Sequence, residues 1–295
     1  MTMGEAKKRG TKVERIALAQ ARASASPKVR EVARVGIASN ENFLVRSRDG
    51  KTQDASYVIF PILRQHADKK TSELIGTGFF VAKGGIFVTA GHVLKAALEE
   101  DERGPFGLGI VQLLPDGSFV ERPIRKAIVH DTSDIGIGVC AEMTSSIRGK
   151  LDNPILCLST RDPALGEHIF TYAYPDTVTE PLEAKTAVYI NPHFYAGNIV
   201  EHLPNGRDSV LIPWPCFRTS MHIHGGASGG PVFDSSGAVF GINTLSMEPH
   251  TDTSYVTKVR DAIGVVIDEI SIGEGTELGR YSLGELAARG YAVIK

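Results

Sequence analysis

The chain has 295 residues, of which 42% are hydrophobic and 22% are charged, fractions that are ordinary for a globular protein. Its 32 basic and 34 acidic residues nearly balance, which excludes a global basic field that would hold nucleic acid or an anionic membrane. No stretch free of Asp, Glu, Lys and Arg reaches the roughly 18 residues of a membrane-spanning helix, so a transmembrane protein is excluded as well.

The N-terminal arm is basic, unlike the rest of the chain. Residues 1–38 contain nine Lys or Arg and three Asp or Glu, and weak helical spacing lies on either side of Pro27. We predict a basic arm over residues 1–55 that is helical or partly disordered. Two interpretations stay open, a simple leader segment and an arm that docks on nucleic acid or on an acidic partner.

Two features indicate an intracellular, cytoplasmic protein. The first residues contain no apolar core of a secretory signal peptide. The three cysteines, Cys140, Cys157 and Cys216, are odd in number and have no Cys-x-x-Cys spacing, so neither a disulfide framework nor a zinc site is expected. We expect no metal and no cofactor.

From about Ser56 the chain consists of short apolar or alternating runs separated by turn signals such as Asn205-Gly206 and Ser236-Gly237. More than a dozen short strands with few helices predict an all-β protein of two six-stranded antiparallel β-barrels. The expected strands are Tyr57–Leu63, Gly78–Ala82, Ile86–Thr89, Leu108–Leu114, Ser118–Val120, Ile124–Val129, Ile135–Val139, His168–Tyr172, Ala187–Ile190, Val210–Trp214, Pro231–Phe233, Val239–Asn243 and Tyr255–Val259.

Short helices are expected at three places. One covers Val93–Leu98, one covers Asp261–Ile270, and a third begins at Ser282, where Ser282 and Glu285 have the spacing of a capping box. The predicted organisation is therefore an arm over 1–55, a domain over 56–270 and a tail over 271–295. Within the domain we place barrel one at about 56–150, barrel two at about 160–260 and a closing helix at about 261–270.

His92 lies in the segment Phe87-Val-Thr-Ala-Gly-His92-Val93, in which an apolar strand leads through small residues to an imidazole at a helix start. Small residues before an imidazole leave room for another residue to reach it. A single histidine is more often structural than catalytic, and this chain has nine.

Asp134 stands directly before the apolar strand Ile135–Val139. Such an aspartate is usually a turn residue, but it can also be the carboxylate that fixes an imidazole tautomer. Asp131 is the competitor, and we favour Asp134 because a shielded carboxylate holds an imidazole better than a solvated one.

Ser228 lies in the segment Gly225-Gly-Ala-Ser228-Gly-Gly-Pro231. A serine hydroxyl needs a base to become a nucleophile, and acyl transfer also needs N–H donors aimed at the developing oxyanion. Glycines can turn the backbone so that N–H groups beside the serine converge. The alternative is a glycine-rich loop with an incidental serine.

Taken together, the three segments stand in the order His, Asp, Ser, which is the chymotrypsin order. With Gly76-Thr-Gly-Phe-Phe-Val81 and Gly237-Ala-Val-Phe-Gly-Ile242, they resemble the trypsin-like (chymotrypsin-fold) serine proteases, closest to the bacterial, HtrA-like branch without a PDZ domain. The resemblance covers about residues 56–270.

The resemblance implies roles for particular residues. Ser228 is the nucleophile, His92 the general base and Asp134 the orienting carboxylate. The backbone N–H groups of Gly226 and Ser228 form the oxyanion hole. An extended substrate pairs with the strand of barrel two that comprises Thr244, Leu245 and Ser246.

Two positions depart from digestive trypsins. Ala227 stands where those enzymes have the aspartate that pairs with a new N-terminus, so we predict control by loop ordering or by a partner. His222 occupies the position six residues before the serine, where trypsins have an aspartate. Either His222 and His224 favour an acidic or amide side chain of the substrate, or both point away and the site accepts small or apolar residues.

We therefore predict an intracellular serine endopeptidase with a protein or peptide substrate, acting in a stress or defence system of bacteria. A regulatory partner is expected at residues 1–55 or 271–295. We expect the protein to bind neither nucleic acid nor a membrane. The alternative is a catalytically silent trypsin-like scaffold that binds a protein partner.

Overall fold

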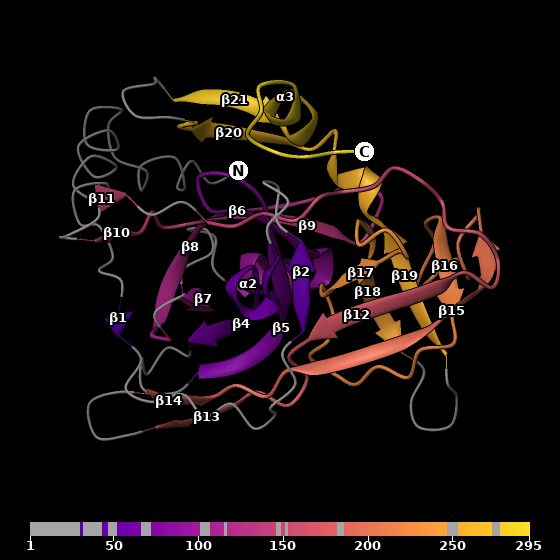
Figure 1. Ribbon diagram of the computed structural model, residues 1–295, viewed down its shortest axis with the longest axis horizontal. Helices are drawn as coiled ribbons and strands as arrows, with labels where there is room; N and C mark the ends of the chain where they lie inside the picture. Colours follow the sequence, from indigo (N-terminus) through magenta and orange to yellow (C-terminus); the bar gives the residue numbers. More distant parts are fainter. Residues whose placement is uncertain are drawn as a thin grey trace, which may run out of the picture.

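The computed structural model describes residues 30–31, 43–46, 52–65, 72–100, 107–114, 117–145, 149–150, 153–181, 186–246, 253–272 and 278–295. They form two six-stranded antiparallel β-barrels that lie side by side, with a few short helices (Figure 1). The predicted fold class is therefore confirmed. No helix in these ranges is long and apolar enough to cross a membrane.

Barrel one has the hydrogen-bonded order β8-β7-β4-β5-β6-β9, and a further pairing of β8 with β9 closes it. Its interior is apolar, with the ring of Phe60 packed against Phe80 and Phe87 at centroid distances of 4.5 and 5.5 Å. A Cβ at Gly138 would lie 2.1 Å from the Phe87 ring, which explains a glycine in this strand. The strands are β4 (Ile59–Gln65), β5 (Ser72–Ala82), β6 (Ile86–Ala90), β7 (Leu108–Leu113), β8 (Phe119–Val129) and β9 (Ile135–Cys140).

Barrel two is closed in the order β12-β15-β16-β19-β18-β17. A separate apolar cluster fills it, and the rings of Phe217 and Phe240 meet there at 5.6 Å. The strands are β12 (His168–Ala173), β15 (His193–Leu203), β16 (Cys216–Thr219), β17 (Pro231–Phe233), β18 (Val239–Ser246) and β19 (Ser254–Lys258).

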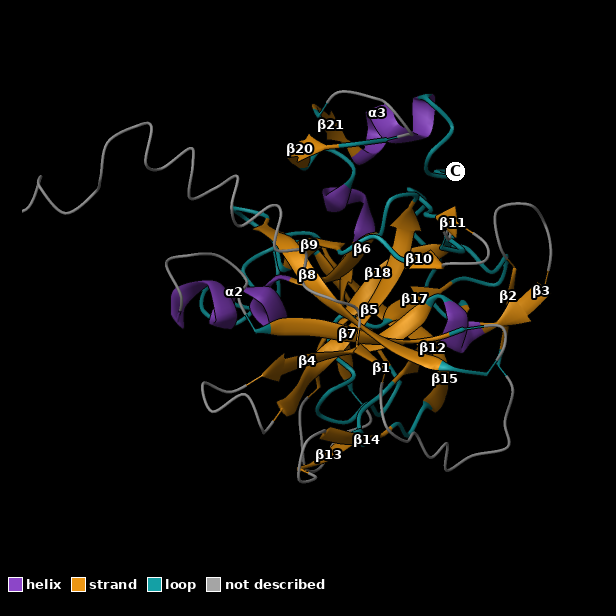
Figure 2. Ribbon diagram, turned by 90° about the vertical axis from the view of Figure 1, so that its left-hand side faces the viewer, coloured by secondary structure: helices purple, strands orange, loops and turns teal. Residues whose placement is uncertain are grey.

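The remaining elements are short and lie around the barrels (Figure 2). They are β1 (Arg30–Glu31), β2 (Leu44–Arg46), β3 (Thr52–Asp54), η2 (Ala55–Tyr57), α2 (Gly91–Glu100), β10 (Thr144–Ser145), β11 (Gly149–Lys150), β13 (Val178–Pro181), β14 (Thr186–Tyr189), η3 (Val259–Ala262), β20 (Val266–Ile270), β21 (Gly279–Ser282) and α3 (Leu283–Ala288). The helices predicted at Val93–Leu98 and after Ser282 are confirmed, the second with its capping box.

The strand predicted at Val210–Trp214 is wrong. Val210 and Leu211 are 81% and 57% exposed, and their N–H groups donate to the side chain of Asp208 in a turn rather than to a strand. The chain instead reaches the barrel at β16, whose four residues are too few to show a pattern. The long strand β15 was not predicted either, because most of its positions are exposed or half-buried.

The closing helix predicted at Asp261–Ile270 is also wrong. Only a 3-10 turn, η3, is helical, and Val266–Ile270 forms strand β20, which pairs with β21. Gly264 interrupts the helical pattern, and the β-branched residues Val265, Val266 and Ile267 favour a strand.

Both chain ends take part in the fold more than the sequence predicted. In the N-terminal arm, β1 pairs with β8, and the Phe43 ring stacks on Tyr172 of barrel two at 5.5 Å; most of residues 1–55 lie outside the described ranges. In the tail, Leu283 and Leu286 are fully buried in the core of barrel one. The described part of 271–295 is therefore an integral layer, seen above barrel one in Figure 1.

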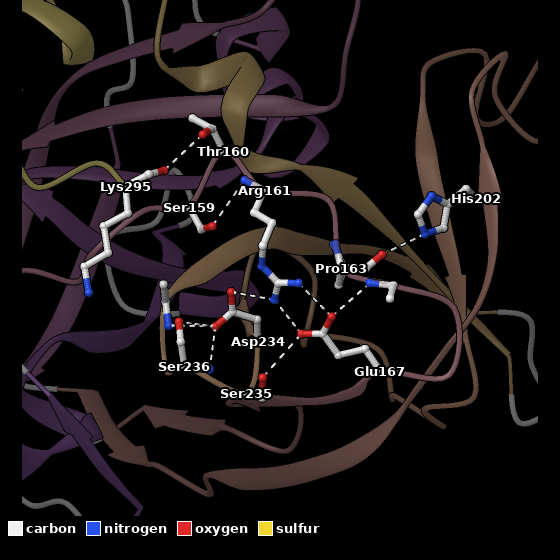
Figure 3. Close-up of polar contacts among 12 residues, drawn as sticks. Ser159, Thr160, Arg161, Pro163, Glu167, His202, Asp234, Ser235, Ser236 and Lys295 are labelled. Carbon is white, nitrogen blue, oxygen red and sulfur yellow. Dashed lines mark hydrogen bonds and ion pairs between the residues drawn. The ribbon is translucent and has the colours of Figure 1, made fainter.

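The segment that joins the barrels is held at several points (Figure 3). Thr160 donates its N–H and its hydroxyl to Lys295 O at 2.9 and 3.0 Å. Arg161 binds Glu167 at 2.8 Å and Asp234 at 3.0 Å, and its hydrogen bond lowers the pKa of Glu167 to about 2. These bonds fix the linker to both the C-terminal segment and barrel two.

Candidate active site

The three chemically reactive residues predicted from the sequence come from different elements. His92 is the second residue of α2, directly after β6, and Asp134 ends the loop before β9. Both belong to barrel one. Ser228 lies in the loop between β16 and β17 of barrel two.

His92 and Asp134 form a preorganised pair. The His92 ring Nδ1 lies 2.9 Å from Asp134 Oδ2 and 3.1 Å from Oδ1, and the His92 backbone N–H donates to Oδ1 at 2.8 Å. The Asp134 side chain is 5% exposed and that of His92 is 51% exposed. A buried carboxylate on Nδ1 holds the tautomer in which Nε2 can accept a proton.

Gly91 makes room for this pair. A Cβ at residue 91 would lie 3.2 Å from Asp134 Oδ1 and 3.1 Å from Val129. A larger residue before His92 would therefore push on the carboxylate and on Val129, which agrees with the small residue in the sequence pattern.

The backbone of the Ser228 loop leaves two N–H groups unpaired. The Ala227 N–H donates to His224 O, the Gly229 N–H to Asn243 O, and the Gly230 N–H back to Ala227 O. Within residues 226–230, only Gly226 and Ser228 keep an N–H without an acceptor in the described part of the chain. These are the two donors that the sequence assigned to an oxyanion hole, and their role stays a prediction.

Two glycines of this loop cannot be replaced without strain. Gly226 and Gly229 have φ of +89° and +83°, a region that favours glycine. A Cβ at Gly229 would also lie 2.1 Å from Thr89 Oγ1 and 2.3 Å from Thr77 O. The loop is thus pressed against strands β5 and β6 of barrel one.

The Ser228 hydroxyl is bonded to a backbone carbonyl and not to the imidazole. Its Oγ donates to the Thr244 carbonyl at 3.3 Å, and it makes no hydrogen bond with the His92 ring, although both residues are described. The nucleophile assigned from the sequence is therefore not hydrogen-bonded to the base in this structure, and its catalytic role stays a prediction.

Thr244, Leu245 and Ser246 end strand β18 next to Ser228. β17 pairs with β18 only as far as Ile242, whereas β19 runs beside it to Ser246. One edge of residues 244–246 is therefore unpaired by any described strand. Such an edge can accept an extended peptide.

His222 and His224 belong to an aromatic cluster that the sequence did not reveal. Their rings meet at 5.0 Å, and Tyr195 Oη lies 3.0 Å from His224 Nδ1. His193 stacks on Tyr195 at 5.9 Å and binds Asp176 at 2.8 Å. Tyr195 and His193 were missed because they lie on β15, a strand without a clear apolar alternation.

Three or more metal-ligating side chains do not come together anywhere in the described ranges. The three cysteines are free, and burial raises the pKa of the Cys140 thiol to about 12 and of Cys216 to about 11. The chemistry available at the site is therefore that of a hydroxyl, an imidazole, a carboxylate and backbone N–H groups.

Comparison with known proteins identifies the family of the chain. The family model described as "Trypsin-like peptidase domain" matches residues 76–242, more than half of the chain and all three candidate residues. No curated protein sequence matches the chain.

Two solved structures are similar in fold. The active form of the Rv3671c protease from M. tuberculosis has a TM-score of 0.50 and 15% identity, covering 76% of this chain and 84% of its own. The crystal structure of Deg5 has a TM-score of 0.48 and 20% identity, covering 70% of this chain and 85% of its own.

Proposed function

Because the chain belongs to the trypsin-like peptidase domain family, we propose that it is a serine endopeptidase that cuts proteins or peptides through an acyl-enzyme intermediate. The observation that supports this most is the pairing of a buried Asp134 with His92 in one barrel, opposite two unpaired N–H groups beside Ser228 in the other. A peptidase needs these parts together, and a general binding surface needs none of them.

The proposed reaction follows from these positions. His92 Nε2 takes the proton of Ser228 Oγ as the hydroxyl attacks the scissile carbonyl. The imidazolium that forms is stabilised by Asp134, and the N–H groups of Gly226 and Ser228 bind the oxyanion. His92 then gives its proton to the leaving amine, and water releases the acyl group from Ser228 by the same steps in reverse order.

The substrate backbone would lie along Thr244, Leu245 and Ser246 as an added strand, because that edge of β18 is unpaired. His222 remains the candidate for side-chain preference. An acidic or amide side chain would meet the imidazoles of His222 and His224, whereas a preference for small or apolar residues would mean that both rings point away. Cleavage of a peptide library distinguishes these outcomes, and strong cleavage after Arg would contradict both.

The proposed enzyme works inside the cell and is held in check by loop ordering or by a partner. The Ser228 hydroxyl must leave Thr244 O and turn to His92 before it can react. Ala227 is fully buried and offers no carboxylate to a new N-terminus. Finding such an N-terminus beside Ala227 after cleavage within residues 1–55 would contradict this part of the proposal.

The same orientation of Ser228 Oγ favours a second candidate, a catalytically silent scaffold that binds a partner along β18. In a scaffold the hydroxyl would keep its bond to Thr244 O under all conditions. The two candidates differ in whether Ser228 can be activated.

Labelling with a fluorophosphonate probe tests this difference. We expect the wild type and Ser235→Ala, which changes an exposed serine of the β17–β18 turn, to be labelled at the same rate. Ser228→Ala should lose labelling, because the nucleophile is worth about 10⁶-fold in rate. Absence of labelling in all three, also after cell extract is added, would favour the scaffold.

A further inference from the structure

Thr77 connects barrel one directly to the Ser228 loop. It lies in β5, is fully buried, and belongs to the segment Gly76-Thr77-Gly78. Its N–H donates to Ser228 O at 2.8 Å, and its hydroxyl donates to Gly226 O at 3.0 Å. One residue thus binds the carbonyls of both residues whose N–H groups are unpaired.

These two bonds complete the restraint of two peptide planes. The 226–227 plane is held at its carbonyl by Thr77 Oγ1 and at its N–H by His224 O. The 228–229 plane is held at its carbonyl by the Thr77 N–H and at its N–H by Asn243 O. The plane between them carries the Ser228 N–H and is held at its own carbonyl, Ala227 O, by the Gly230 N–H, so it is restrained both directly and through its two neighbours.

Thr77 is itself fixed by two further hydrogen bonds. Its hydroxyl oxygen accepts from the Tyr174 N–H at 3.2 Å, which directs the hydroxyl proton towards Gly226 O. Its carbonyl accepts from Thr89 Oγ1 at 2.7 Å. The hydroxyl is therefore an oriented donor and not a freely rotating one.

The loop needs such an external anchor because it has little stiffness of its own. Gly225 and Gly226 are consecutive, and a Cβ at Gly225 would meet nothing within 4 Å. Gly226 has access to several backbone conformations at low cost, so its carbonyl can turn when it has no partner.

We propose that Thr77 is a positioning residue whose hydroxyl sets the oxyanion hole by holding the Gly226 carbonyl away from the reacting atoms. This inference rests on the proposed function, because an oxyanion hole has a purpose only in acyl transfer. It assigns to barrel one, which supplies His92 and Asp134, a second task in the site.

The test compares three variants of the full chain. Thr77→Val keeps the shape of the side chain and removes the hydroxyl, whereas Thr77→Ser keeps the hydroxyl. Thr219→Val is the matched control, because it removes a buried hydroxyl that bonds to Ser254 Oγ at 2.7 Å within barrel two.

The fluorophosphonate labelling rate and peptide hydrolysis are measured for each variant, together with the thermal midpoint of unfolding. We expect Thr77→Val to slow labelling and kcat by about 10- to 100-fold with KM nearly unchanged, since losing one whole oxyanion donor costs about 10²- to 10³-fold. Thr77→Ser should restore the rate, and Thr219→Val should lower only the thermal midpoint.

Crystal structures of the wild type and Thr77→Val give a readout that does not depend on activity. We expect the 226–227 peptide to turn in Thr77→Val. An unturned peptide together with an unchanged rate would overturn the inference. If the wild type is not labelled even after cell extract is added, the proposed function fails, and the peptide orientation then tests only whether Thr77 holds the loop.

Discussion

The two halves of the site differ in what holds them. His92 and Asp134 are joined by hydrogen bonds within barrel one, between a helix start and a neighbouring loop. The Ser228 loop belongs to barrel two, but two of its carbonyls are held by Thr77 of barrel one, and the Ser228 hydroxyl is bonded to Thr244 O.

In the proposed enzyme, this difference would place control at the Ser228 half of the site. The acid–base pair forms as soon as barrel one is folded, whereas the nucleophile and the oxyanion donors depend on the contact between the barrels. A partner or substrate that changes this contact alters the Ser228 half and leaves the His92 half intact.

The largest effect after loss of the nucleophile is expected from Asp134→Asn. The substitution replaces one carboxylate oxygen by an NH₂ group, which cannot accept the Nδ1–H bond that Asp134 Oδ2 accepts and favours the wrong imidazole tautomer. We expect kcat at neutral pH to fall by about 10⁴-fold with the fold retained. Peptide hydrolysis measures kcat, and circular dichroism checks the fold. A decrease in kcat of less than tenfold would remove Asp134 from the proposed mechanism.

Gly229→Ala tests the dependence of the Ser228 half on barrel one. The added Cβ would press on Thr89 Oγ1 and Thr77 O at a position with positive φ, so we expect a loss of about 3 kcal/mol in unfolding free energy.

Gly225→Ala is the matched control in the same loop, since its Cβ meets nothing within 4 Å. We expect its unfolding free energy to change by less than about 0.5 kcal/mol. Equal losses in the two variants, measured by urea unfolding, would show that the loop does not press on β5 and β6.

The smallest expected effect is a loss of unfolding free energy at alkaline pH, and it differs between the cysteine thiols of the two barrels. Burial raises the pKa of Cys140 to about 12, while an unfolded chain ionises a thiol near 9. The protonated Cys140 thiol therefore contributes its full share to the free energy of unfolding below pH 9. This contribution is lost as the pH rises towards 12, by roughly 1 kcal/mol per pH unit.

Urea unfolding between pH 8 and 10.5 measures this slope. Cys140→Ala should flatten it, and Cys216→Ala should do so less, because the pKa of Cys216 is raised only to about 11. Equal slopes in the wild type and Cys140→Ala would contradict the prediction.

The barrel strands that bury one or both faces were predictable, because their apolar runs are short and end at turn residues. β15 was not, since a strand with most side chains exposed has no apolar alternation to read. Val210–Trp214 failed for the opposite reason: its first two apolar residues, Val210 and Leu211, are exposed in a turn fixed by Asp208.

In the candidate site, His92, Asp134 and Ser228 could be proposed from the sequence because their proposed chemistry requires small residues or glycines beside them. Thr77 could not, since a threonine between two glycines in a strand looks like ordinary packing. Its importance arises from bonds to residues about 150 positions further along the chain, and only the folded structure shows them.

Those long-range bonds also set a time at which activity can begin. Ser228 is made 94 residues after Asp134, which at about 5–20 residues per second is roughly 5–19 s of synthesis. During that interval a nascent chain carries a finished base and carboxylate but no nucleophile. The proposed enzyme would therefore become able to cleave peptides only after both barrels are complete and docked.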